Sequence, residues 1–242
     1  MKYNILKSEL IGIKNKIKNQ GSQDYSMIFE GKCMYAIVVS DGHSNDFFEY
    51  SKYGAQIACK VFIESIKNNL QDVNELKNYI YDEWMKEVYY DFYTRNYRVF
   101  KVDYLKYSTT LVGVAIINQE MLVLKIGDGN IYIRENGKYK EILENNHKKV
   151  VDSLGRLESK EFIRIEKINT NETKLEQISI FTDGYENSFK TKNKLKYSLS
   201  EVYINFNKSI FSRVKTIKQY DENLVKLKGM DDISIIHLFK VI

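Results

Sequence analysis

The chain has 242 residues, 43% of them hydrophobic and 29% charged, and no apolar run approaches the ~20 residues that cross a bilayer. Its net charge of +5 comes from lysines that alternate with acids, without a basic stripe, zinc-finger spacing or RNA-binding aromatic pattern. We therefore expect a chain that binds neither a membrane nor nucleic acid.

The first half of the chain predicts three strands followed by two helices. The strands are expected in ILKSELIGI (residues 5–13), DYSMIFEG (24–31) and CMYAIVVSDG (33–42). The first helix is indicated by apolar or small residues spaced three or four apart, at Phe47, Ser51, Ala55, Ala58, Phe62, Ile66 and Leu70. The second helix is expected from Val73 to about Tyr97, with a buried face at Leu76, Ile80, Trp84, Val88 and Phe92.

The second half of the chain is mostly strand-like. Four antiparallel strands joined by tight turns are expected in STTLVGVAIIN (108–118), EMLVLKIGDG (120–129), NIYIRENG (130–137) and KYKEIL (138–143). After an irregular stretch, two strands are expected at 161–168 and 175–184, then a polar helical region, and a last strand at 232–242. This order predicts an α+β fold in which two packed antiparallel sheets, a β-sandwich, are flanked by helices.

Neither cysteine has the spacing of a metal ligand. Both Cys33 and Cys59 lie in apolar patterns, so we expect buried, reduced thiols in a cytoplasmic protein. The N-terminus MKYNILKSEL has neither the apolar core nor the cleavage site of a signal peptide. No proline, Gly/Ser-rich linker or repeat divides the chain, and a single domain over residues 1–242 is the simplest expectation.

Three apolar strands end in an Asp-Gly pair, at Asp41-Gly42, Asp128-Gly129 and Asp183-Gly184. Asp-Gly favours a type I′ hairpin turn, and this explains GDGNIYI (127–133), where a strand follows at once. It does not explain the other two pairs, because helical or irregular residues follow them. These two pairs therefore need another reason.

Acids at strand ends recur through the chain, at Asp24, Asp41, Asp128, Asp183 and Asp231. A folded core could bring all of them to one edge of a sheet, where carboxylates repel one another unless protons or cations neutralise them. Oxygen ligands with few His and Cys nearby select Mg²⁺ or Mn²⁺ over zinc. Two such ions activate water and hold phosphoryl oxygens during the hydrolysis of phosphate esters.

The order of these motifs resembles the metal-dependent protein phosphatases, the type 2C serine/threonine family. VVSDGHSN (38–45) is similar to the family's Asp-Gly-His or Asp-Gly-x-Gly segment. Seven further segments are similar to family motifs in the same order: SQDYSMIF (22–29), YGAQIA (53–58), STTLVGVAI (108–116), KIGDGNIYI (125–133), DSLG (152–155), IFTDGYEN (180–187) and MDDISII (230–236). The resemblance runs nearly end to end and implies a two-sheet sandwich with metals between the sheets at one end.

The resemblance also implies a role for each acid. Asp41 would bridge two Mg²⁺ or Mn²⁺ ions, Gly42 would offer its carbonyl to one of them, and Asp183 and Asp231 would hold the other. Three further acids would bind an ion weakly or only indirectly. Asp24 would act mostly through bound water, and Asp128 matches a weaker position for a third ion. Asp232 would contact the metal ligands rather than the ions.

His43 follows the bridging aspartate. In family members with Asp-Gly-His, this histidine is the proposed general acid for the leaving serine or threonine oxygen, and the alternative here is an exposed turn histidine. We expect His147 and His237 to be structural, since neither lies in a matching motif. Thr109 and Thr110 suit a strand, with a helper role in ordering water left open. Trp84 and Tyr107 are expected in the packing.

The sequence departs from the family pattern at the phosphate-binding arginine. Five residues before Asp24, where many members have arginine, stands Asn19. If the first strand continued regularly, Lys14, Lys16 and Lys18 would share one face, and Lys18, then Lys16, are candidates for holding phosphate. The alternative is a solvated basic edge strand. The family's Gly-Asp-Ser-Arg hairpin reads Gly-Asp-Gly-Asn here, and the segment between Asp183 and Asp231 is short, so any flap should be small.

These observations together predict a Mg²⁺- or Mn²⁺-dependent phosphatase that hydrolyses phosphoserine or phosphothreonine with a water activated by the ions. No cysteine lies in a nucleophile loop, which argues against a phosphoenzyme. The expected partners are a phosphorylated protein and an opposing serine/threonine kinase. The alternative is a catalytically weak, phosphatase-like module that binds or regulates a phosphoprotein.

Overall fold

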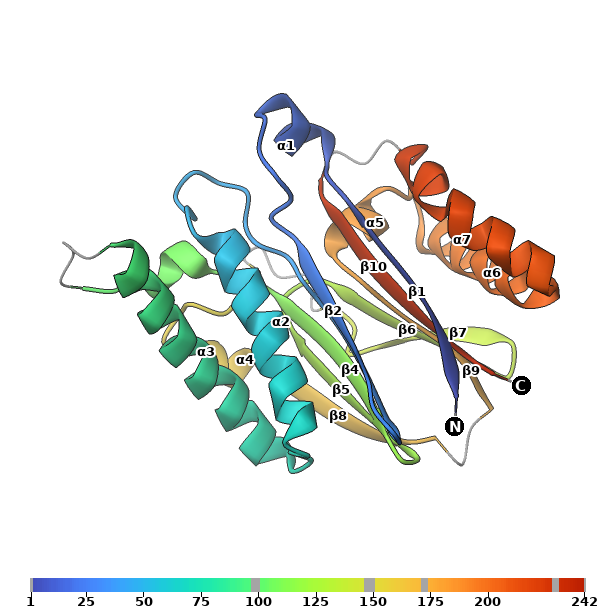
Figure 1. Cartoon of the computed structure of the whole chain (residues 1–242), viewed down its shortest axis with the longest axis horizontal. Helices are drawn as coiled ribbons and strands as arrows, with labels where there is room; N and C mark the ends of the chain where they lie inside the picture. Colours follow the sequence, from blue (N-terminus) through green and yellow to red (C-terminus); the bar gives the residue numbers. More distant parts are fainter. Residues whose placement is uncertain (1, 97–100, 146–150, 171–173, 228–230, 242) are drawn as a thin grey trace.

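Two five-stranded antiparallel sheets lie face to face in this chain (Figure 1). The computed structural model describes residues 2–96, 101–145, 151–170, 174–227 and 231–241. The first sheet has the strand order β1-β10-β9-β6-β7 and the second has the order β2-β3-β4-β5-β8. The strands are β1 (Tyr3–Leu10), β2 (Tyr25–Glu30), β3 (Met34–Ser40), β4 (Leu111–Ile117), β5 (Glu120–Ile126), β6 (Asn130–Glu135), β7 (Lys138–Ile142), β8 (Arg164–Asn169), β9 (Leu175–Phe181) and β10 (Ile233–Lys240).

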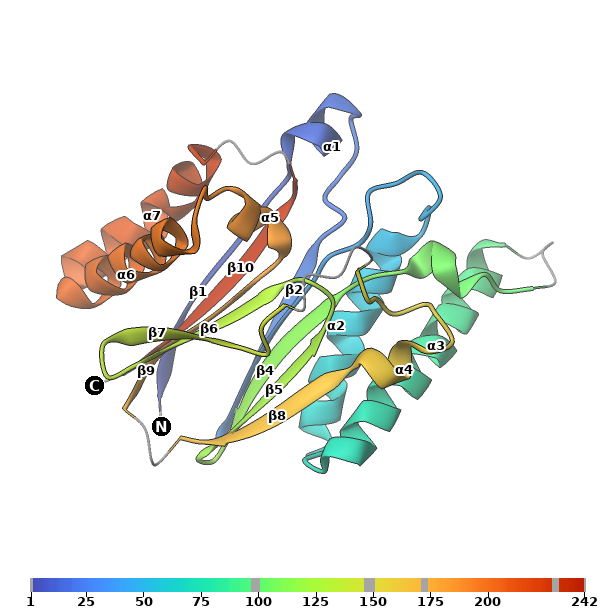
Figure 2. The ribbon, with the colours of Figure 1, turned by 180° about the vertical axis from the view of Figure 1, so that it is seen from behind.

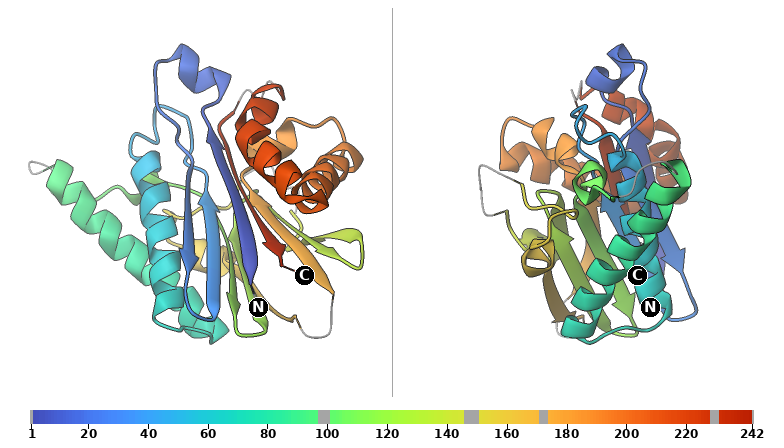
Figure 3. Two further views of the ribbon diagram at one scale, coloured as in Figure 1. Left: turned by 45° about the vertical axis from the view of Figure 1, so that its right-hand side comes forward. Right: turned by 90° about the vertical axis from the view of Figure 1, so that its left-hand side faces the viewer.

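Helices cover the outer face of each sheet (Figure 3). The helices α2 (Ser51–Lys67) and α3 (Val73–Arg95) pack on the second sheet, and α6 (Lys192–Lys208) and α7 (Ile210–Val225) pack on the first. The shorter helices are α1 (Ile13–Ile17), the 3₁₀ helix η1 (Tyr104–Tyr107), α4 (Ser159–Phe162) and α5 (Asp183–Asn187). The predicted fold class is confirmed. No helix among the described residues is long and apolar enough to cross a membrane.

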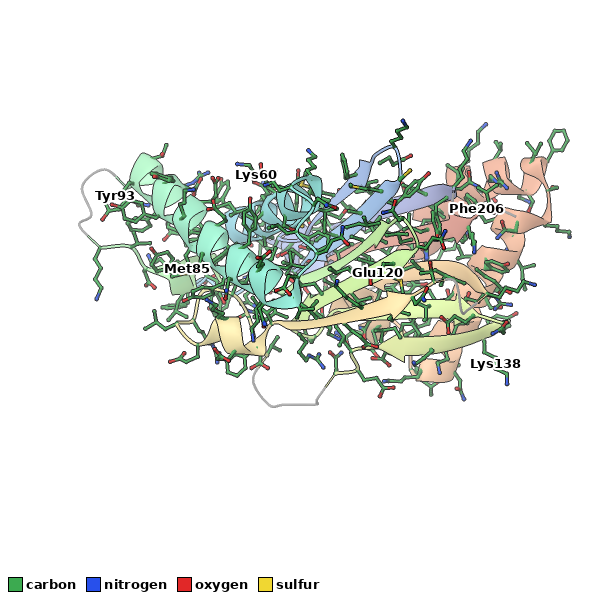
Figure 4. The ribbon with its side chains drawn as sticks, turned by 90° about the horizontal axis from the view of Figure 1, so that it is seen from below. Lys60, Met85, Tyr93, Glu120, Lys138 and Phe206 are labelled. Carbon is green, nitrogen blue, oxygen red and sulfur yellow. The ribbon has the colours of Figure 1, made fainter. Side chains whose placement is uncertain are left out.

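Three apolar layers hold the stack together, one between the sheets and one beneath each pair of helices. On β3, Ala36 and Val38 face α2 while Ile37 and Val39 face the other sheet. Both faces of this strand are buried, which explains its continuous apolar run. Seen from below, Met85 on α3 and Phe206 on α6 lie toward opposite ends of the stack (Figure 4).

The two long predicted helices are confirmed with small changes at their ends. The predicted face of α3 is buried as expected, and Trp84 and Tyr107 are fully buried in the packing. The helix α2 begins only at Ser51, so Phe47 lies outside it and is 52% exposed. The expectation for the cysteines is right for Cys59, which is buried, and wrong for Cys33, which is exposed just before β3.

The prediction that the first strand continues past Ile11 is wrong. The strand β1 ends at Leu10, opposite the first residue of its partner β10, so the pairing that would extend it is missing. The chain then forms the short helix α1, whose N-cap Gly12 donates its backbone N–H to Oδ1 of Asp232 over 2.7 Å. The lysines of this segment therefore do not alternate along a strand.

The predicted hairpin at Gly127-Asp128-Gly129 is also wrong. The strand β5 pairs with β4 and β8, while β6 pairs with β7 and β9 of the other sheet. Figure 2 shows the chain passing from β5 to β6. The three residues thus form a crossing between the sheets, and Gly127 takes a φ of 103° there, which favours glycine.

Candidate active site

The ends of several strands meet at one end of the sandwich, at the top of Figure 1. Antiparallel neighbours place the start of one strand beside the end of the next, as in the pairs Tyr25↔Ser40 and Asn130↔Phe181. The acids adjoining these ends are therefore brought to the same end of both sheets. They are Asp24 before β2, Asp41 after β3, Asp128 between β5 and β6, Asp183 after β9 and Asp231 before β10.

Asp41 lies at the centre of this group. Its carboxyl lies within hydrogen-bonding reach of those of Asp24 and Asp183. Its backbone is held by two threonines directly before β4. Thr109 donates from Oγ1 to the Asp41 carbonyl over 2.7 Å, and the Thr110 Oγ1 accepts the Asp41 N–H at 3.1 Å. Both threonines are buried and position Asp41 from the second sheet.

The electrostatics of the group are those of crowded carboxylates without enough positive charge. Burial raises the pKa of Asp41 well above its ordinary value, and the charges of Asp24, Asp183 and Asp128 raise it further. Burial, Asp128 and Asp231 raise the pKa of Asp183 to about 6. Burial also raises the pKa of Asp24, against a hydrogen bond from Thr182 that lowers it. A bound cation would relieve this cost.

The two acids before β10 have different surroundings. The side chain of Asp231 is partly exposed, and its Oδ2 lies 3.2 Å from the ammonium of Lys14 on α1. The neighbouring Asp232 is buried, and its carboxylate accepts hydrogen bonds from three donors, the backbone N–H groups of Gly12 and Gln23 and Nδ2 of Asn15, over 2.7 to 2.8 Å. Asp232 thus ties α1 and the residue before Asp24 to the start of β10.

The glycines of two Asp-Gly pairs are required by close backbone contacts. A Cβ on Gly42 would lie 2.8 Å from the carbonyl oxygen of Gln23, and a Cβ on Gly184 would lie 1.9 Å from that of Asp232. Any side chain at either position would push apart the segments that carry the acids. Close packing therefore explains the two pairs that a hairpin turn does not explain.

The donors at this end suit a hard divalent cation. They are carboxylates and backbone carbonyls, which are oxygen ligands. Within the described residues, no three His, Cys, Asp or Glu side chains are already arranged to hold one ion. Mg²⁺ keeps several of its waters and takes only one or two carboxylates in many sites.

His43 lies beside the group, on the loop after β3. Its ring packs against Phe48 with centroids 4.7 Å apart, and its carbonyl accepts a hydrogen bond from Oγ of Ser51 over 2.8 Å. Burial lowers the pKa of His43, and the charge of Arg156 lowers it further. Sequence reasoning did not single out Arg156, although it directly follows the DSLG motif.

The lysines proposed for phosphate lie on or just after α1. Lys18 lies 3.6 Å from Asp46 on the His43 loop, and Lys16 is exposed. The lysine that approaches a candidate ligand is Lys14, through Asp231. Asn19 adopts a φ of 54°, a conformation that asparagine tolerates better than arginine.

The other histidines do not belong to the group. His237 is buried under α7, where its ring contacts Tyr220 and Ser179, and burial lowers its pKa to about 3. His147 falls outside the described residues.

Beside Asp128 the molecule has a cavity of about 710 Å³. Its lining includes Asn187, which donates to the Asp183 carboxylate over 2.8 Å, and Arg164, Glu186 and Lys190. The described residues of the segment after Asp183 form α5, α6 and α7, and two of these helices pack on the outer face of the first sheet.

Metal-dependent protein phosphatases of the 2C type have this arrangement, a two-sheet sandwich between helical layers with acids clustered at one end of the sheets. The model of the protein phosphatase 2C family matches residues 11–226, and the chain belongs to this family of metal-dependent protein phosphatases, which typically use Mg²⁺ or Mn²⁺. No curated protein sequence gives a significant match.

Solved structures show the same fold at low sequence identity. The serine/threonine phosphatase Stp1 from Staphylococcus aureus has a TM-score of 0.68 at 12% identity, over 100% of this chain and 96% of that one. The serine/threonine phosphatase of S. agalactiae has a TM-score of 0.64 at 16% identity, over 99% and 100%. A C. elegans sex-determining protein has a TM-score of 0.65 at 12% identity, with 99% of this chain covering 65% of that one.

Proposed function

We propose that this chain is a Mg²⁺- or Mn²⁺-dependent serine/threonine protein phosphatase, formed by a single catalytic domain over residues 1–242. The observation that carries the proposal is the convergence of five aspartates, from five separate segments, at one end of a 2C-type sandwich. Their mutual repulsion and burial support a cation site, because a bound cation would neutralise them.

Different aspartates are candidates for binding each of the two ions. Asp41 reaches both Asp24 and Asp183 and is the bridging candidate, with the Gly42 carbonyl next to it. Asp183 and Asp231 are candidates for the second ion, Asp24 acts through water, and Asp128 is the weakest candidate. Bound divalent ions supply a water of lowered pKa and hold the phosphoryl oxygens. The role of Asp232 is to keep these ligands in place through its three hydrogen bonds.

His43 is the candidate for the proton that the leaving serine or threonine oxygen needs. It must be protonated to act, and its lowered pKa means that the approach of an anionic phosphate has to favour the charged ring. Lys18 and Lys16 are the candidates for attracting the phosphate, since no arginine stands at position 19. The substrate is a phosphorylated protein in the cytoplasm. A serine/threonine kinase catalyses the opposing phosphorylation.

Metal-dependent turnover tests the proposal. Purified protein is assayed with p-nitrophenyl phosphate and with phosphoserine and phosphothreonine peptides, with added Mn²⁺ or Mg²⁺ and with EDTA, between about pH 6 and 9. We expect hydrolysis that needs the divalent ion and stops with EDTA. If no metal-dependent turnover is found at any pH, the proposed phosphatase activity is contradicted.

A second candidate is a phosphatase-like module that binds a phosphoprotein without efficient turnover. One observation favours it: Asn19 stands where many members of the family have an arginine. The same assay distinguishes the two functions. A module of this kind would bind a phosphopeptide in a titration but release no phosphate from it.

A further inference from the structure

The hairpin of helices α6 and α7 exposes many of the chain's large hydrophobic side chains. Of the 16 large hydrophobic residues that are exposed in the described part of the chain, 7 lie between Tyr197 and Val225. At the turn that joins the two helices, Ile210 is 77% exposed and Phe211 is 89% exposed. Single exposed hydrophobic residues need no explanation, but a gathering of them indicates an interaction surface.

The most exposed part of this hairpin is formed by two adjacent stripes along the first half of α7. Within each stripe the residues are four and three positions apart, which is the spacing of one helix face. The first stripe is apolar, and the second combines an aromatic ring with two ammonium groups. We call these six exposed residues the tip face: Ile210, Val214 and Ile217 in the first stripe, and Phe211, Lys215 and Lys218 in the second.

The same hairpin carries the excess positive charge of the chain. Residues 192–226 contain eight lysines and arginines against three acids, a net charge of +5 that equals the charge of the whole chain. Lys208, the last residue of α6, adds an exposed cation at the turn beside the tip face. Lys208, Lys215 and Lys218 form no ion pair with any described residue. A surface that is both apolar and cationic complements a partner that is both apolar and anionic.

The inner side of the hairpin is firmly packed, which leaves the tip face on the outside. Ser209 caps α7, since its Oγ accepts the backbone N–H of Ser212 over 3.0 Å. Beneath the turn, Arg213 donates to the carbonyl of Phe206 over 3.3 Å. The ring of Phe206 stacks on that of Phe239 in β10, with centroids 4.1 Å apart. These contacts hold the turn in one conformation before any partner binds.

The tip face lies away from the acidic end of the sandwich. The helix α7 has 16 residues, so its first turn lies about 20 Å from its last. Phe239, beneath the turn, belongs to the end of β10 that is opposite to Asp231. Figures 1 and 2 show the turn between α6 and α7 projecting sideways from the sandwich, while the other end of α7 approaches the acidic end. A partner on the tip face would therefore leave the candidate active site open.

We propose that the tip face binds the surface of an anionic lipid bilayer. The boundary between headgroups and acyl chains accepts protruding side chains such as Ile210 and Phe211 without a matching pocket. Lysines beside them keep their ammonium groups in the headgroup layer, where they meet lipid phosphates. A second copy of the chain fits less well, because the hairpin's charge of +5 would face the same charge.

Such attachment needs no segment that spans the bilayer, whose absence was the ground for expecting no membrane binding. It also goes beyond the proposed phosphatase activity and does not depend on it.

Sedimentation with lipid vesicles tests the proposal. The purified chain is mixed with vesicles of about 70% phosphatidylcholine and about 30% phosphatidylserine, and separately with vesicles of phosphatidylcholine alone. We expect binding to the anionic vesicles to be at least about fivefold tighter. It should weaken between about 50 and 300 mM salt, because ions screen the attraction. No binding to the anionic vesicles, or equal binding to both kinds, would overturn the proposal.

Truncation of an apolar side chain locates the contact. Phe211→Ala should weaken binding to the anionic vesicles by roughly tenfold, because the ring no longer enters the interface. The control is Leu157→Ala, which truncates a side chain that is 79% exposed outside the hairpin and should leave binding unchanged. Because both positions are exposed, both variants should keep the circular dichroism spectrum of the wild type. Wild-type binding by Phe211→Ala would contradict the proposal.

Removal of charge gives a second, independent test. The double variant Lys215→Gln with Lys218→Gln should weaken binding by roughly 20-fold, at about fivefold for each lysine near an anionic surface. The matched control, Lys32→Gln with Lys101→Gln, removes two exposed lysines from outside the hairpin and should have a much smaller effect. Equal losses in the two double variants would mean that the overall charge, and not the tip face, attracts the vesicles.

A soluble amphipathic peptide with a leucine face and a glutamate face distinguishes a protein partner from a lipid surface. If the chain binds this peptide, loses it in Phe211→Ala and binds no anionic vesicles, the tip face serves a protein partner and the proposal is wrong. Vesicle binding is measured without turnover, so failure of the proposed phosphatase activity would leave this proposal unaffected.

Discussion

Thr182 donates a hydrogen bond from Oγ1 to Oδ2 of Asp24 over 2.7 Å. Oγ1 of Thr182 also accepts a hydrogen bond from the backbone N–H of Ser234, at 3.0 Å. The contact links the end of β9 in the first sheet to the start of β2 in the second. Because Thr182 directly precedes Asp183, it holds two candidate ligands of the metal site in register across the sheets.

Replacement of this threonine should therefore affect both stability and metal binding. In Thr182→Val the shape is kept but Asp24 loses its donor and the Ser234 N–H loses its acceptor, at a cost of roughly 1–3 kcal/mol in unfolding free energy. We also expect weaker Mn²⁺ binding, measured by calorimetry. The control is Thr170→Val, which removes a buried hydroxyl that donates to the Gln119 carbonyl at the far end of the sandwich. It should lower stability without changing Mn²⁺ affinity. An unchanged affinity in Thr182→Val would show that the contact serves the fold alone.

Neutralising the central acids should separate activity from stability. Asp41→Asn and Asp183→Asn each remove an anionic ligand, and phosphatase activity should fall by orders of magnitude. In EDTA, each variant should unfold at a higher urea concentration than the wild type, because burial and neighbouring carboxylates raise the pKa of both acids. Retention of most of the wild-type rate by Asp41→Asn would mean that the bridging position is misassigned.

The pH dependence of stability in EDTA should show that the folded chain disfavours the ionised form of Asp183. Its pKa is about 6 in the folded chain against 3.8 ordinarily, so the folded state disfavours ionisation. Its contribution to stability is present below about pH 4 and is lost as the pH rises through about 6. The stability gain of Asp183→Asn over the wild type should therefore grow across this window in urea titrations, and added Mn²⁺ should reverse the order. A gain that is constant from about pH 4 to 7 would contradict the raised pKa.

His43→Ala should matter most where the leaving group needs a proton. General acid catalysis contributes about 10²–10⁴-fold, so hydrolysis of a phosphoserine peptide should fall by that order, and that of p-nitrophenyl phosphate much less. The ratio of the two kcat values, wild type against variant, is the measurement. Equal losses on both substrates would instead indicate that His43 supports the metal site or the packing against Phe48.

The lysines of α1 can be compared directly. If Lys18 attracts the phosphate in ground and transition states alike, Lys18→Ala should raise KM for a phosphopeptide and leave kcat nearly unchanged, with a smaller effect of Lys16→Ala. Lys14→Ala is the informative comparison, because Lys14 contacts Asp231 and should change metal affinity as well. Asn19→Arg should tighten substrate binding through a guanidinium fork, against the strain of a φ of 54°. If none of these variants changes KM, the lysines do not hold the phosphate.

Much of this architecture could be predicted from local patterns. The helical face through Leu76, Ile80 and Trp84 and the apolar run of β3 depend on residues that are neighbours in the chain, and both were correctly placed. The membership of strands in sheets could not be predicted in the same way. Asp-Gly after β5 favours a turn locally, but the partners of β5 and β6 lie in different sheets. Pairing between distant strands decides that choice.

By itself, the sequence determined that acids stand where buried strands end, because alternating and continuous apolar runs mark the strands and their ends. Only the tertiary structure decided which groups those acids meet. Asp232 binds Gly12 across 220 residues of chain, Asp24 binds Thr182 across 158, and the buried ammonium of Lys125 makes no hydrogen bond to a described residue. Such contacts join different sheets and helices, so their energies depend on packing and burial that no local pattern contains.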